Sequence, residues 1–385
     1  MEGFSFQLAT RVLFGNGVVD QIGQEAKKLG SAAAVVVTDA NLIHTPGFSV
    51  MLDSLTAAGL RAGVFPEVEA DPTEETIARG VRFLRDKEAD LVIAFGGGSP
   101  MDAAKAISLM HTNSGAIDDY LRGRQVFSKP GLTLICIPTT AGTGSEVTLN
   151  AVIRDPRTRE KIGVGHPYIA PTLALVDPEL HVSMPPAVTA ATGMDALTHA
   201  IEAYLAARAH PITDAVCLHA IRLIGGHLRR AVGCGRDLDA RGNMALASLL
   251  AGIGFTNAGL GAVHGIAHPV GARYGVAHGV ANGIVLPYVM EYCLMANRER
   301  FRQIAAAIGE DVSGLSLKEA AVRSVEAVKE LKQDVGLPAA LKDVGVAEAE
   351  LEAIVESAAG YRLLPNSPRE LNAADLRIIV RRAIG

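Results

Sequence analysis

The sequence predicts a two-domain protein, with an α/β domain built on a parallel sheet over residues 1–185 and an all-helical domain over residues 186–385. In the first part, short continuous apolar runs alternate with segments whose apolar residues recur at helical spacing, a pattern typical of parallel strands covered on both faces. After Met184-Pro185-Pro186, long stretches rich in Ala, Leu and Ile keep helical spacing, and almost no run is typical of a strand. A length of 385 residues suits two domains of ordinary size.

The individual elements follow from these patterns. Three apolar runs predict buried strands over residues 33–38, 90–95 and 132–137, and the segments 76–86 and 101–110 predict helices. In the second part, we expect helices over residues 213–230, 241–252, 299–308 and 318–331. Because open parallel sheets bind ligands at the carboxyl ends of their strands, the loops after the three strands are the first places to search for a site.

Composition excludes several classes of protein. The 36 Lys and Arg residues against 41 Asp and Glu leave a net charge of −5, and aromatic residues make up 4%, which argues against a dedicated nucleic-acid binder. No run reaches the roughly 18 apolar residues that a membrane span requires, and no signal peptide is visible. The four cysteines form no CxxC pair, which is typical of reduced thiols. We therefore expect a cytoplasmic protein without nucleic-acid or membrane partners.

A glycine-rich loop follows the second predicted strand. Gly96, Gly97 and Gly98 precede Ser99, which we expect to cap the next helix. Asp102 lies three residues later, where its carboxylate could accept from the backbone N–H of the cap residue, as in a capping box. Glycines let a phosphate approach the backbone, and a helix N-terminus supplies N–H donors. The loop is not the GxGxxG fingerprint, and an ordinary strand-to-helix turn is the alternative. Its position favours pyrophosphate binding.

Two other strand ends carry polar residues. Asp39 follows the first strand and suits hydrogen bonding to a ribose hydroxyl, where its charge would repel a 2′-phosphate. It therefore favours NAD over NADP, with a plain helix cap as the alternative. Residues 138–145 follow the third strand and are dense in hydroxyl groups. We expect this second loop to form a wall of a cofactor cleft, although a turn without further consequence is also consistent with the pattern.

Histidines recur at helical spacing in the second part of the chain. Asp195 and His199 are four residues apart, as are His264 and His268, so each pair shares one face of a helix. His278 follows a segment containing proline and glycine, and a break there would let it return toward the others. A single buried histidine is usually a core residue. Several imidazoles with one carboxylate in apolar surroundings need a partner, and a divalent iron, zinc or nickel ion fits.

Four segments together resemble the iron-dependent (group III) alcohol dehydrogenase family. They are FGGGSPMDAAKAI, IPTTAGTGSEVT, TGMDALTHAIEAY and AVHGIAHPVGARYGVAHGVANGIVLP, and they lie in the family's order and spacing. The resemblance implies the fold shared with dehydroquinate synthase, in which a dinucleotide-binding α/β domain precedes a helical metal-binding domain, with NAD and a divalent metal between them. It also implies a metal-dependent, NAD-linked alcohol dehydrogenase or aldehyde reductase.

The resemblance assigns roles by motif position. It implies that Asp195, His199, His264 and His278 are the metal ligands, and that His268 lies near the nicotinamide and is not a ligand. Because an imidazole can accept and donate a proton near neutral pH, we expect His268 to be a catalytic proton relay. The alternative is that His268 only supports the ligands or packs beside them. The remaining positions are expected cofactor contacts at Asp39, Asp71, Gly96, Gly97, Gly98, Ser99, Asp102, Thr139, Thr140, Thr143 and Lys161, and expected substrate-pocket residues at Asn150 and Phe255.

One position departs from the family pattern. Many members carry Asn-Pro-Thr where this chain reads Asp71-Pro72-Thr73. An aspartate there could bond a ribose hydroxyl but would sit poorly beside a phosphate. The contact at position 71 is therefore open, while the family resemblance stands.

Metal, substrate and assembly are less closely defined. Fe²⁺ is expected because iron accepts five or six ligands readily, while Zn²⁺ is the alternative because it generally binds such sites more tightly. Arg273 is the only Lys or Arg between Phe255 and Tyr292, so we expect a small neutral primary alcohol, diol or aldehyde rather than an acid. A dehydroquinate synthase-like or glycerol dehydrogenase-like enzyme is the alternative. We also expect a homodimer or larger homo-oligomer, to which a strand over residues 3–9 could contribute.

Overall fold

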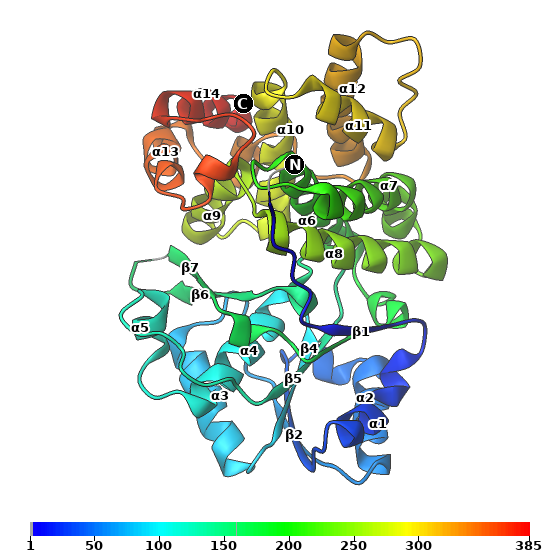
Figure 1. Ribbon diagram of the computed structural model, residues 1–385, viewed down its shortest axis with the longest axis vertical. Coiled ribbons are helices and arrows are strands. Elements are labelled where there is room, and N and C mark those ends of the chain that lie inside the picture. The colour runs from blue at the N-terminus through cyan, green and yellow to red at the C-terminus, as the bar shows by residue number, and fades with distance from the viewer. Residues whose placement is uncertain (1–2, 159) are drawn as a thin grey trace. The chain divides into compact units, whose positions relative to one another are not determined.

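The computed structural model describes residues 3–158 and 160–385, and the chain divides into two compact units (Figure 1). The sheet unit comprises Leu8–Thr140 and Ser145–Ser183. The helical unit comprises Met184–Gly385, Ala141–Gly144 and the described N-terminal residues up to Gln7. The predicted division at residue 185 did not assign the 141–144 segment or the N-terminal residues to the helical unit. Close packing explains the place of the 141–144 segment. A Cβ atom on Gly144 would lie 2.6 Å from the Cα atom of Gly252.

The sheet unit is built around six parallel strands in the order β1-β8-β5-β4-β2-β3. The strands predicted over residues 33–38, 90–95 and 132–137 are confirmed as β2, β4 and β5. They lie side by side, and Val36 pairs with Ile93, which pairs with Ile135. The strand bounds are β1 (Arg11–Phe14), β2 (Ala33–Val37), β3 (Arg61–Phe65), β4 (Leu91–Gly96), β5 (Thr133–Pro138) and β8 (Leu173–Val176).

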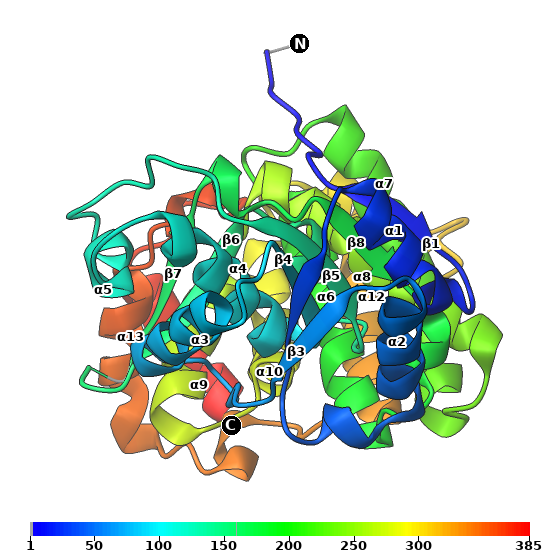
Figure 2. The same cartoon turned by 90° about the horizontal axis from the view of Figure 1, so that it is seen from below.

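Helices cover both faces of this sheet, as Figure 2 shows. Alternate residues of each strand enter different cores, because successive strand side chains point to opposite faces. Val35 packs in one apolar cluster with Ile107 of α4, whereas Val36 packs in another with Met51 of α2. The helices are α1 (Ile22–Lys28) and α2 (Pro46–Ala57) on one face, and α3 (Glu74–Asp86) and α4 (Gly98–Thr112) on the other.

A small hairpin and a short helix complete the sheet unit, and neither was predicted. Strands β6 (Asn150–Asp155) and β7 (Glu160–Gly165) pair antiparallel and form a second, two-stranded sheet. In β6 the side chains of Ala151 and Ile153 are buried, while the residues between them are partly exposed. The short helix is α5 (Ile117–Leu121).

The helical unit packs its helices around one apolar core. The helices predicted over residues 213–230, 241–252, 299–308 and 318–331 are present, and each is longer than predicted, most of all the second, which extends over Leu238–Ala258. Among the described residues no single helix is long and apolar enough to cross a membrane, and only α8 and α9, bent by 109°, reach that length together. The helices are α6 (Pro186–Leu205), α7 (Pro211–Gly233), α8 (Leu238–Ala258), α9 (Ala262–Tyr274), α10 (His278–Cys293), α11 (Arg298–Ile308), α12 (Leu317–Asp334), α13 (Leu351–Ala359) and α14 (Ala373–Ile384).

Candidate metal centre

Three helices of the helical unit bring four metal-binding side chains together. Asp195 and His199 lie one turn apart on α6, His264 lies in the first turn of α9, and His278 begins α10. One ligand atom from each lies within 4.8 Å of the others. The first three residues are buried, and His278 is partly exposed. A group of three imidazoles and one carboxylate at this separation matches the donor set that divalent transition metals prefer.

Local backbone features explain why His278 returns to this group. Gly275 has a left-handed φ of 67° and ends α9, so the helical conformation is interrupted before α10, as the sequence predicted. A Cβ atom on Gly279 would lie 2.1 Å from the carbonyl oxygen of Ala191. Glycine therefore lets α10 approach α6 closely enough to place His278 beside Asp195, with His278 Nε2 at 3.7 Å from Asp195 Oδ1.

Hydrogen bonds on the outer nitrogens set the tautomers of two histidines. Nδ1 of His199 lies 3.2 Å from the carbonyl oxygen of Gly142, and Nδ1 of His264 lies 2.5 Å from Oε2 of Glu202. A carbonyl oxygen can only accept, so Nδ1 of His199 carries the proton; the Glu202 carboxylate assigns the same tautomer to His264. Burial lowers the pKa of His264 well below its ordinary value, which keeps the ring neutral. Both rings then have an unprotonated Nε2.

The side chain of Asn282, on α10, lies against the inner atoms of this group. Its Nδ2 lies 2.7 Å from Asp195 Oδ1, 3.2 Å from His264 Nε2 and 3.1 Å from His278 Nε2. An amide nitrogen carries two hydrogens, so it cannot satisfy three acceptors. Within the described residues, Oδ1 of this buried asparagine has no hydrogen-bond partner.

The electrostatics of Asp195 also indicate that the four-residue group fits a cation. Burial alone would raise its pKa, but the three neighbouring imidazoles and Asn282 outweigh burial and hold the pKa below the ordinary value. The carboxylate is therefore ionised in a buried setting, which is costly without a partner of opposite charge. Together with the unprotonated nitrogens and the excess of acceptors over donors, this charge shows that the group fits a divalent metal ion.

Two further predicted residues adjoin this centre. His268 lies one turn after His264 on α9, and its ring centroid is 5.4 Å from that of His278 and 5.4 Å from that of Tyr361. Phe255, at the end of α8, stacks on His199 with ring centroids 4.5 Å apart. Asn150, the other predicted pocket residue, lies in the sheet unit at the start of β6, so the two pocket predictions fall in different units.

The glycine loop joins β4 to α4 in the sheet unit. Gly96 ends the strand with a φ of 154°, and a Cβ atom there would lie 2.5 Å from Cγ of Pro100. Gly97 is the N-cap residue and α4 begins at Gly98, so the prediction that Ser99 caps the helix is wrong. Ser99 lies two residues after the cap, inside the helix, and its Oγ instead accepts from the backbone N–H of Asp71. The partly exposed N-terminus of a 15-residue helix at a strand end can hold an anion.

Other predicted cofactor contacts lie around the same edge of the sheet. Thr139 donates its N–H to the carbonyl of Gly96, and the side chain of Thr140 lies against Gly97. Asp71 has a left-handed φ of 59° and forms a 2.8 Å ion pair with the nearly buried Lys161. This pairing holds the unusual aspartate beside the glycine loop.

Three predicted contacts have a different local setting. Asp39, two residues after β2, accepts at Oδ1 from the N–H groups of Asn41 and Leu42, so it caps the next turn. The carboxylate of Asp102 does not form the expected capping-box hydrogen bond, because its oxygens accept from Ser145 Oγ and the Val152 N–H. Thr143 belongs to the short segment that packs in the helical unit.

Sequence reasoning missed three buried polar residues. Glu202 lies three residues after His199 on α6, and Asn282 lies four residues after His278 on α10, so helical spacing from the predicted ligands could have found both. Lys105 of α4 is fully buried and donates to Ser145 Oγ, Thr148 Oγ1 and the Asn150 carbonyl. Only the apolar neighbours of Lys105 in the sequence signalled its burial.

Comparison with known proteins covers both units. A family model described as iron-containing alcohol dehydrogenase matches residues 9–178. A second model, described as the C-terminal part of the Fe-containing alcohol dehydrogenase family, matches residues 189–384. Each match therefore spans most of one unit.

Individual relatives match along nearly their whole length. The chain is 40% identical over 381 residues to the NAD-dependent methanol dehydrogenase of Bacillus methanolicus, covering 99% of this chain and 100% of that protein. It is 42% identical over 364 residues to the lactaldehyde reductase of Escherichia coli (strain K12), covering 94% and 95%. A solved structure of a 1,3-propanediol oxidoreductase matches with a TM-score of 0.96 at 38% identity, covering 99% of this chain and 100% of that one.

Proposed function

The chain belongs to the iron-containing alcohol dehydrogenase family and is a metal-dependent, NAD-linked alcohol dehydrogenase or aldehyde reductase, and we propose that Asp195, His199, His264 and His278 hold its metal ion. The observation that carries this proposal is the convergence of the four donors within 4.8 Å. The tautomers assigned to His199 and His264 support it, because they leave Nε2 free on both rings. Fe²⁺ is the proposed working ion, with Zn²⁺ as the alternative.

In the proposed reaction, the bound metal ion and NAD have one set of roles and the side chains of the protein have another. When bound, the divalent cation would supply Lewis-acid chemistry and NAD would supply the hydride chemistry. Asn282 donates to Asp195 Oδ1 and orients that carboxylate. Phe255 covers one face of the His199 ring and limits access of water to it. His268 moves the alcohol proton toward solvent, a role that suits an imidazole beside the centre.

The proposed NAD contacts lie in the sheet unit. The N-terminus of α4 with Gly96, Gly97, Gly98 and Ser99 would hold the pyrophosphate, because its N–H groups and dipole favour an anion. The other proposed contacts are Asp39, Asp71, Asp102, Thr139, Thr140, Thr143 and Lys161. The Lys161–Asp71 ion pair supports a contact of these two residues with ribose hydroxyls rather than phosphate, because the aspartate offsets the lysine charge.

The proposed substrate is a small neutral primary alcohol, a diol or the corresponding aldehyde. Arg273 is exposed, and it is the only Lys or Arg between Phe255 and Tyr292. The helices that carry the histidines therefore supply no evident cationic clamp for a carboxylate or phosphate. The names of the similar proteins, which act on methanol, lactaldehyde and 1,3-propanediol, are consistent with this class.

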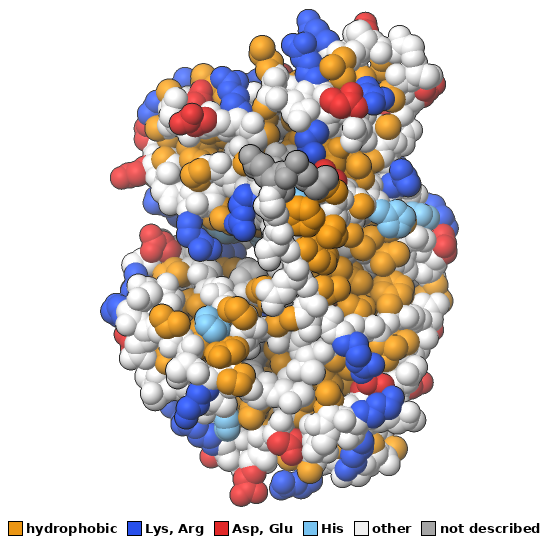
Figure 3. Space-filling model, in the orientation of Figure 1, with side chains coloured by type: hydrophobic (Ala, Val, Ile, Leu, Met, Phe, Trp, Pro, Cys, Tyr) orange, Lys and Arg blue, Asp and Glu red, His pale blue; other side chains and the backbone are white. Residues whose placement is uncertain are grey.

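We also propose a cytoplasmic homodimer or larger homo-oligomer. The four cysteines are free, which suits a reducing compartment. Residues 3–9 form no strand within the chain, and Phe4 and Leu8 are each 45% exposed. Apolar side chains also gather over α8, as Figure 3 shows, with Leu246 and Leu250 only partly buried. A second copy of the chain could cover this apolar surface.

Metal removal tests the proposed function. A chelator-stripped protein should lose turnover by about a hundredfold or more, because metal ions supply several kcal/mol of transition-state stabilisation. Anaerobic addition of Fe²⁺ or Zn²⁺ separately should restore NADH oxidation with short aldehydes. The absorbance of NADH measures the rate for each metal and substrate. Full turnover by the stripped protein would contradict a metal-dependent reaction, and NADH binding without turnover on any added metal would favour the dehydroquinate synthase-like alternative.

Substitution of Asp39 tests the proposed choice of NAD. Asp39→Asn keeps an oxygen that accepts from the N–H groups of Asn41 and Leu42, but it removes the charge that would face a 2′-phosphate. The ratio of kcat/KM for NADP to that for NAD should therefore rise about tenfold to a hundredfold. Steady-state kinetics with both cofactors measure this ratio. A change of less than twofold would show that Asp39 only caps its turn.

A further inference from the structure

Glu202 is a buried carboxylate of α6 that the proposed chemistry does not yet use. Its side chain is 7% exposed, and that of its partner His264 is 2% exposed. Oε2 of Glu202 lies 2.5 Å from Nδ1 of His264, and Oε1 accepts from the N–H of Val263 at 2.7 Å. Glu202 therefore joins the first turn of α9 to the outer nitrogen of a proposed metal ligand.

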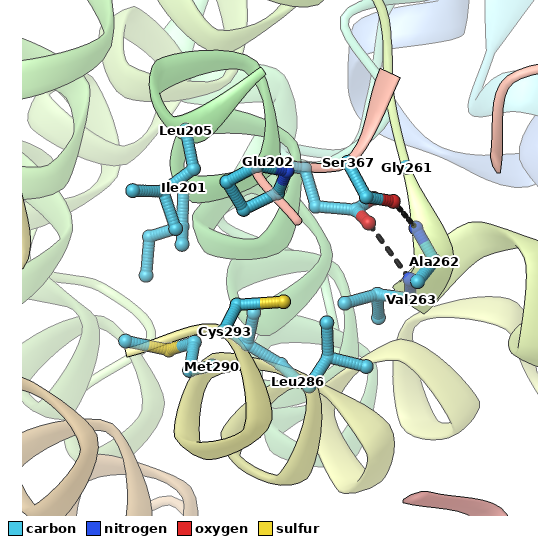
Figure 4. A pocket seen from close by; sticks show the side chains of 12 residues that line it. Ile201, Glu202, Leu205, Gly261, Ala262, Val263, Leu286, Met290, Cys293 and Ser367 are labelled. Atoms are coloured by element: carbon cyan, nitrogen blue, oxygen red, sulfur yellow. Dashed lines mark hydrogen bonds between the residues drawn. The ribbon is translucent and has the colours of Figure 1, made fainter. Parts of the chain in front are cut away.

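Largely apolar side chains and the backbone of Gly261 surround Glu202. A cavity of about 20 Å³ lies beside it and is lined largely by apolar side chains, among them Leu286 and Met290 (Figure 4). A Cβ atom on Gly261 would lie 3.2 Å from Oε1, so the glycine permits the close approach of the carboxylate to α9.

We propose that Glu202 is a positioning residue that keeps the proton of His264 on Nδ1, and that it thereby sets the affinity of the centre for its metal ion. The inference rests on the proposed function, because it takes His264 as a ligand. A carboxylate acceptor orients the ring and raises the basicity of the opposite nitrogen more than a neutral acceptor does. His199 has the neutral version of the same arrangement, with the Gly142 carbonyl as its acceptor.

Glu202→Gln separates this role from simple packing. Glutamine has one oxygen and one NH₂ group, but both partners of Glu202 are N–H donors. The Val263 backbone must remain a donor, so the glutamine oxygen should turn toward it and the NH₂ group toward His264. The His264 imidazole can accept a hydrogen bond from this NH₂ group if its proton moves from Nδ1 to Nε2. The proton would then block the nitrogen that lies in the four-residue group.

The test compares metal affinity and tautomer in the full-length protein. In Glu202→Gln, the Kd for Zn²⁺, measured by competition with a chromogenic chelator, should rise about 10- to 100-fold, the effect typical of outer-shell partners. Two-bond ¹H–¹⁵N spectra of the metal-free, ¹⁵N-histidine-labelled protein should show His264 changing from the Nδ1–H to the Nε2–H form. Loss of its signals in His264→Gln assigns the residue. Glu202→Asp keeps a carboxylate and should retain the Nδ1–H form.

Ser367→Ala is the matched control. Ser367 Oγ accepts from the N–H of Ala262, so it supports the same first turn of α9 without contact with the His264 ring. Ser367→Ala should destabilise that turn but leave the Kd for Zn²⁺ within about twofold of the wild type. An equal loss of affinity in Ser367→Ala and Glu202→Gln would overturn the proposal, because loosening of α9 would then explain both.

Two further outcomes separate this inference from the proposed function. If Glu202→Gln binds Zn²⁺ as tightly as the wild type and His264 keeps its proton on Nδ1, the role of Glu202 is refuted and the metal centre stands. If the wild type itself binds neither Zn²⁺ nor Co²⁺, the metal centre is refuted, and the role of Glu202 with it.

Discussion

Asp195→Asn should leave the protein folded but without its metal ion, and kcat/KM should fall by about a thousandfold or more. Asp195 is the only carboxylate in the four-residue group, so the substitution removes the negative charge that would offset a divalent cation. The asparagine keeps an oxygen at Oδ1 that can still accept from Asn282 Nδ2, so the packing of α6 against α10 should survive. Metal content by mass spectrometry and NADH-linked turnover measure the two losses.

A control variant that should change neither metal content nor turnover comes from the same helical unit. Asp239 on α8 has a side chain that is 65% exposed and pairs with Arg230 at the surface. Asp239→Asn removes the same charge and should keep both the metal ion and turnover within about twofold, because exposed ion pairs contribute little. Retention of metal and of turnover within tenfold in Asp195→Asn would show that the histidines suffice and that Asp195 is not a necessary ligand.

The sequence predicted the neighbouring buried strands β2, β4 and β5, but not the edge strands β1 and β3 or the short buried strand β8. β2 and β4 are buried at every position and therefore appear as uninterrupted apolar runs. At the edges, β1 and β3 expose part of their residues, and β3 contains both arginine and glycine. Their short runs resemble loops, because an edge strand is held by backbone hydrogen bonds to one neighbour rather than by side chains buried on both faces.

Spacing also explains which parts of the candidate site could be predicted. Asp195 and His199 share a helix face, and so do His264 and His268, so periodicity alone paired them. Spacing could place Glu202 near His199 on the same helix, but it could not show which ring each acceptor orients. Glu202 meets His264 across 62 residues, and Gly142 meets His199 across 57. Which carboxylate or carbonyl meets a given imidazole depends on how α6, α9 and the 141–144 segment pack.

The wrong cap prediction has a similar cause. A serine after three glycines has the local chemistry of an N-cap, but α4 begins two residues earlier than that cap would require, with Gly97 in the cap position. Ser99 is then free to accept from Asp71, 28 residues earlier in the sequence. Local propensity indicated that a helix begins in this loop, and a long-range contact decided which residue begins it.

Lys105→Met should destabilise the sheet unit by about 3–5 kcal/mol, the cost of removing one partner from a buried charged network. Lys105 Nζ donates to Ser145 Oγ at 2.8 Å, to Thr148 Oγ1 at 2.8 Å and to the Asn150 carbonyl at 2.9 Å. Ser145 Oγ in turn donates to Asp102 Oδ1. The lysine therefore ties α4, which carries the glycine loop, to the hydroxyl-rich loop after β5. The melting temperature should fall by about 10 °C.

The surface offers a control for the lost charge. Lys27 on α1 is exposed, so Lys27→Met should change the free energy of unfolding by less than about 0.5 kcal/mol. Thermal unfolding followed by circular dichroism measures both variants. Equal stability of Lys105→Met and Lys27→Met would show that the three hydrogen bonds of Lys105 contribute nothing net.

A double variant tests whether charge or hydrogen bonding carries the effect. Burial lowers the pKa of Lys105 and raises that of Asp102, and the charge of each residue opposes the shift of the other. Removing both charges in Asp102→Asn/Lys105→Met should therefore cost less than the sum of the single losses, by about 1–3 kcal/mol of coupling energy. Strictly additive losses would mean that Lys105 acts through its hydrogen bonds alone. A positive coupling would instead mean that Lys105 and Asp102 form one electrostatic unit beneath the glycine loop, so that neither can be changed alone without loosening the proposed cofactor site.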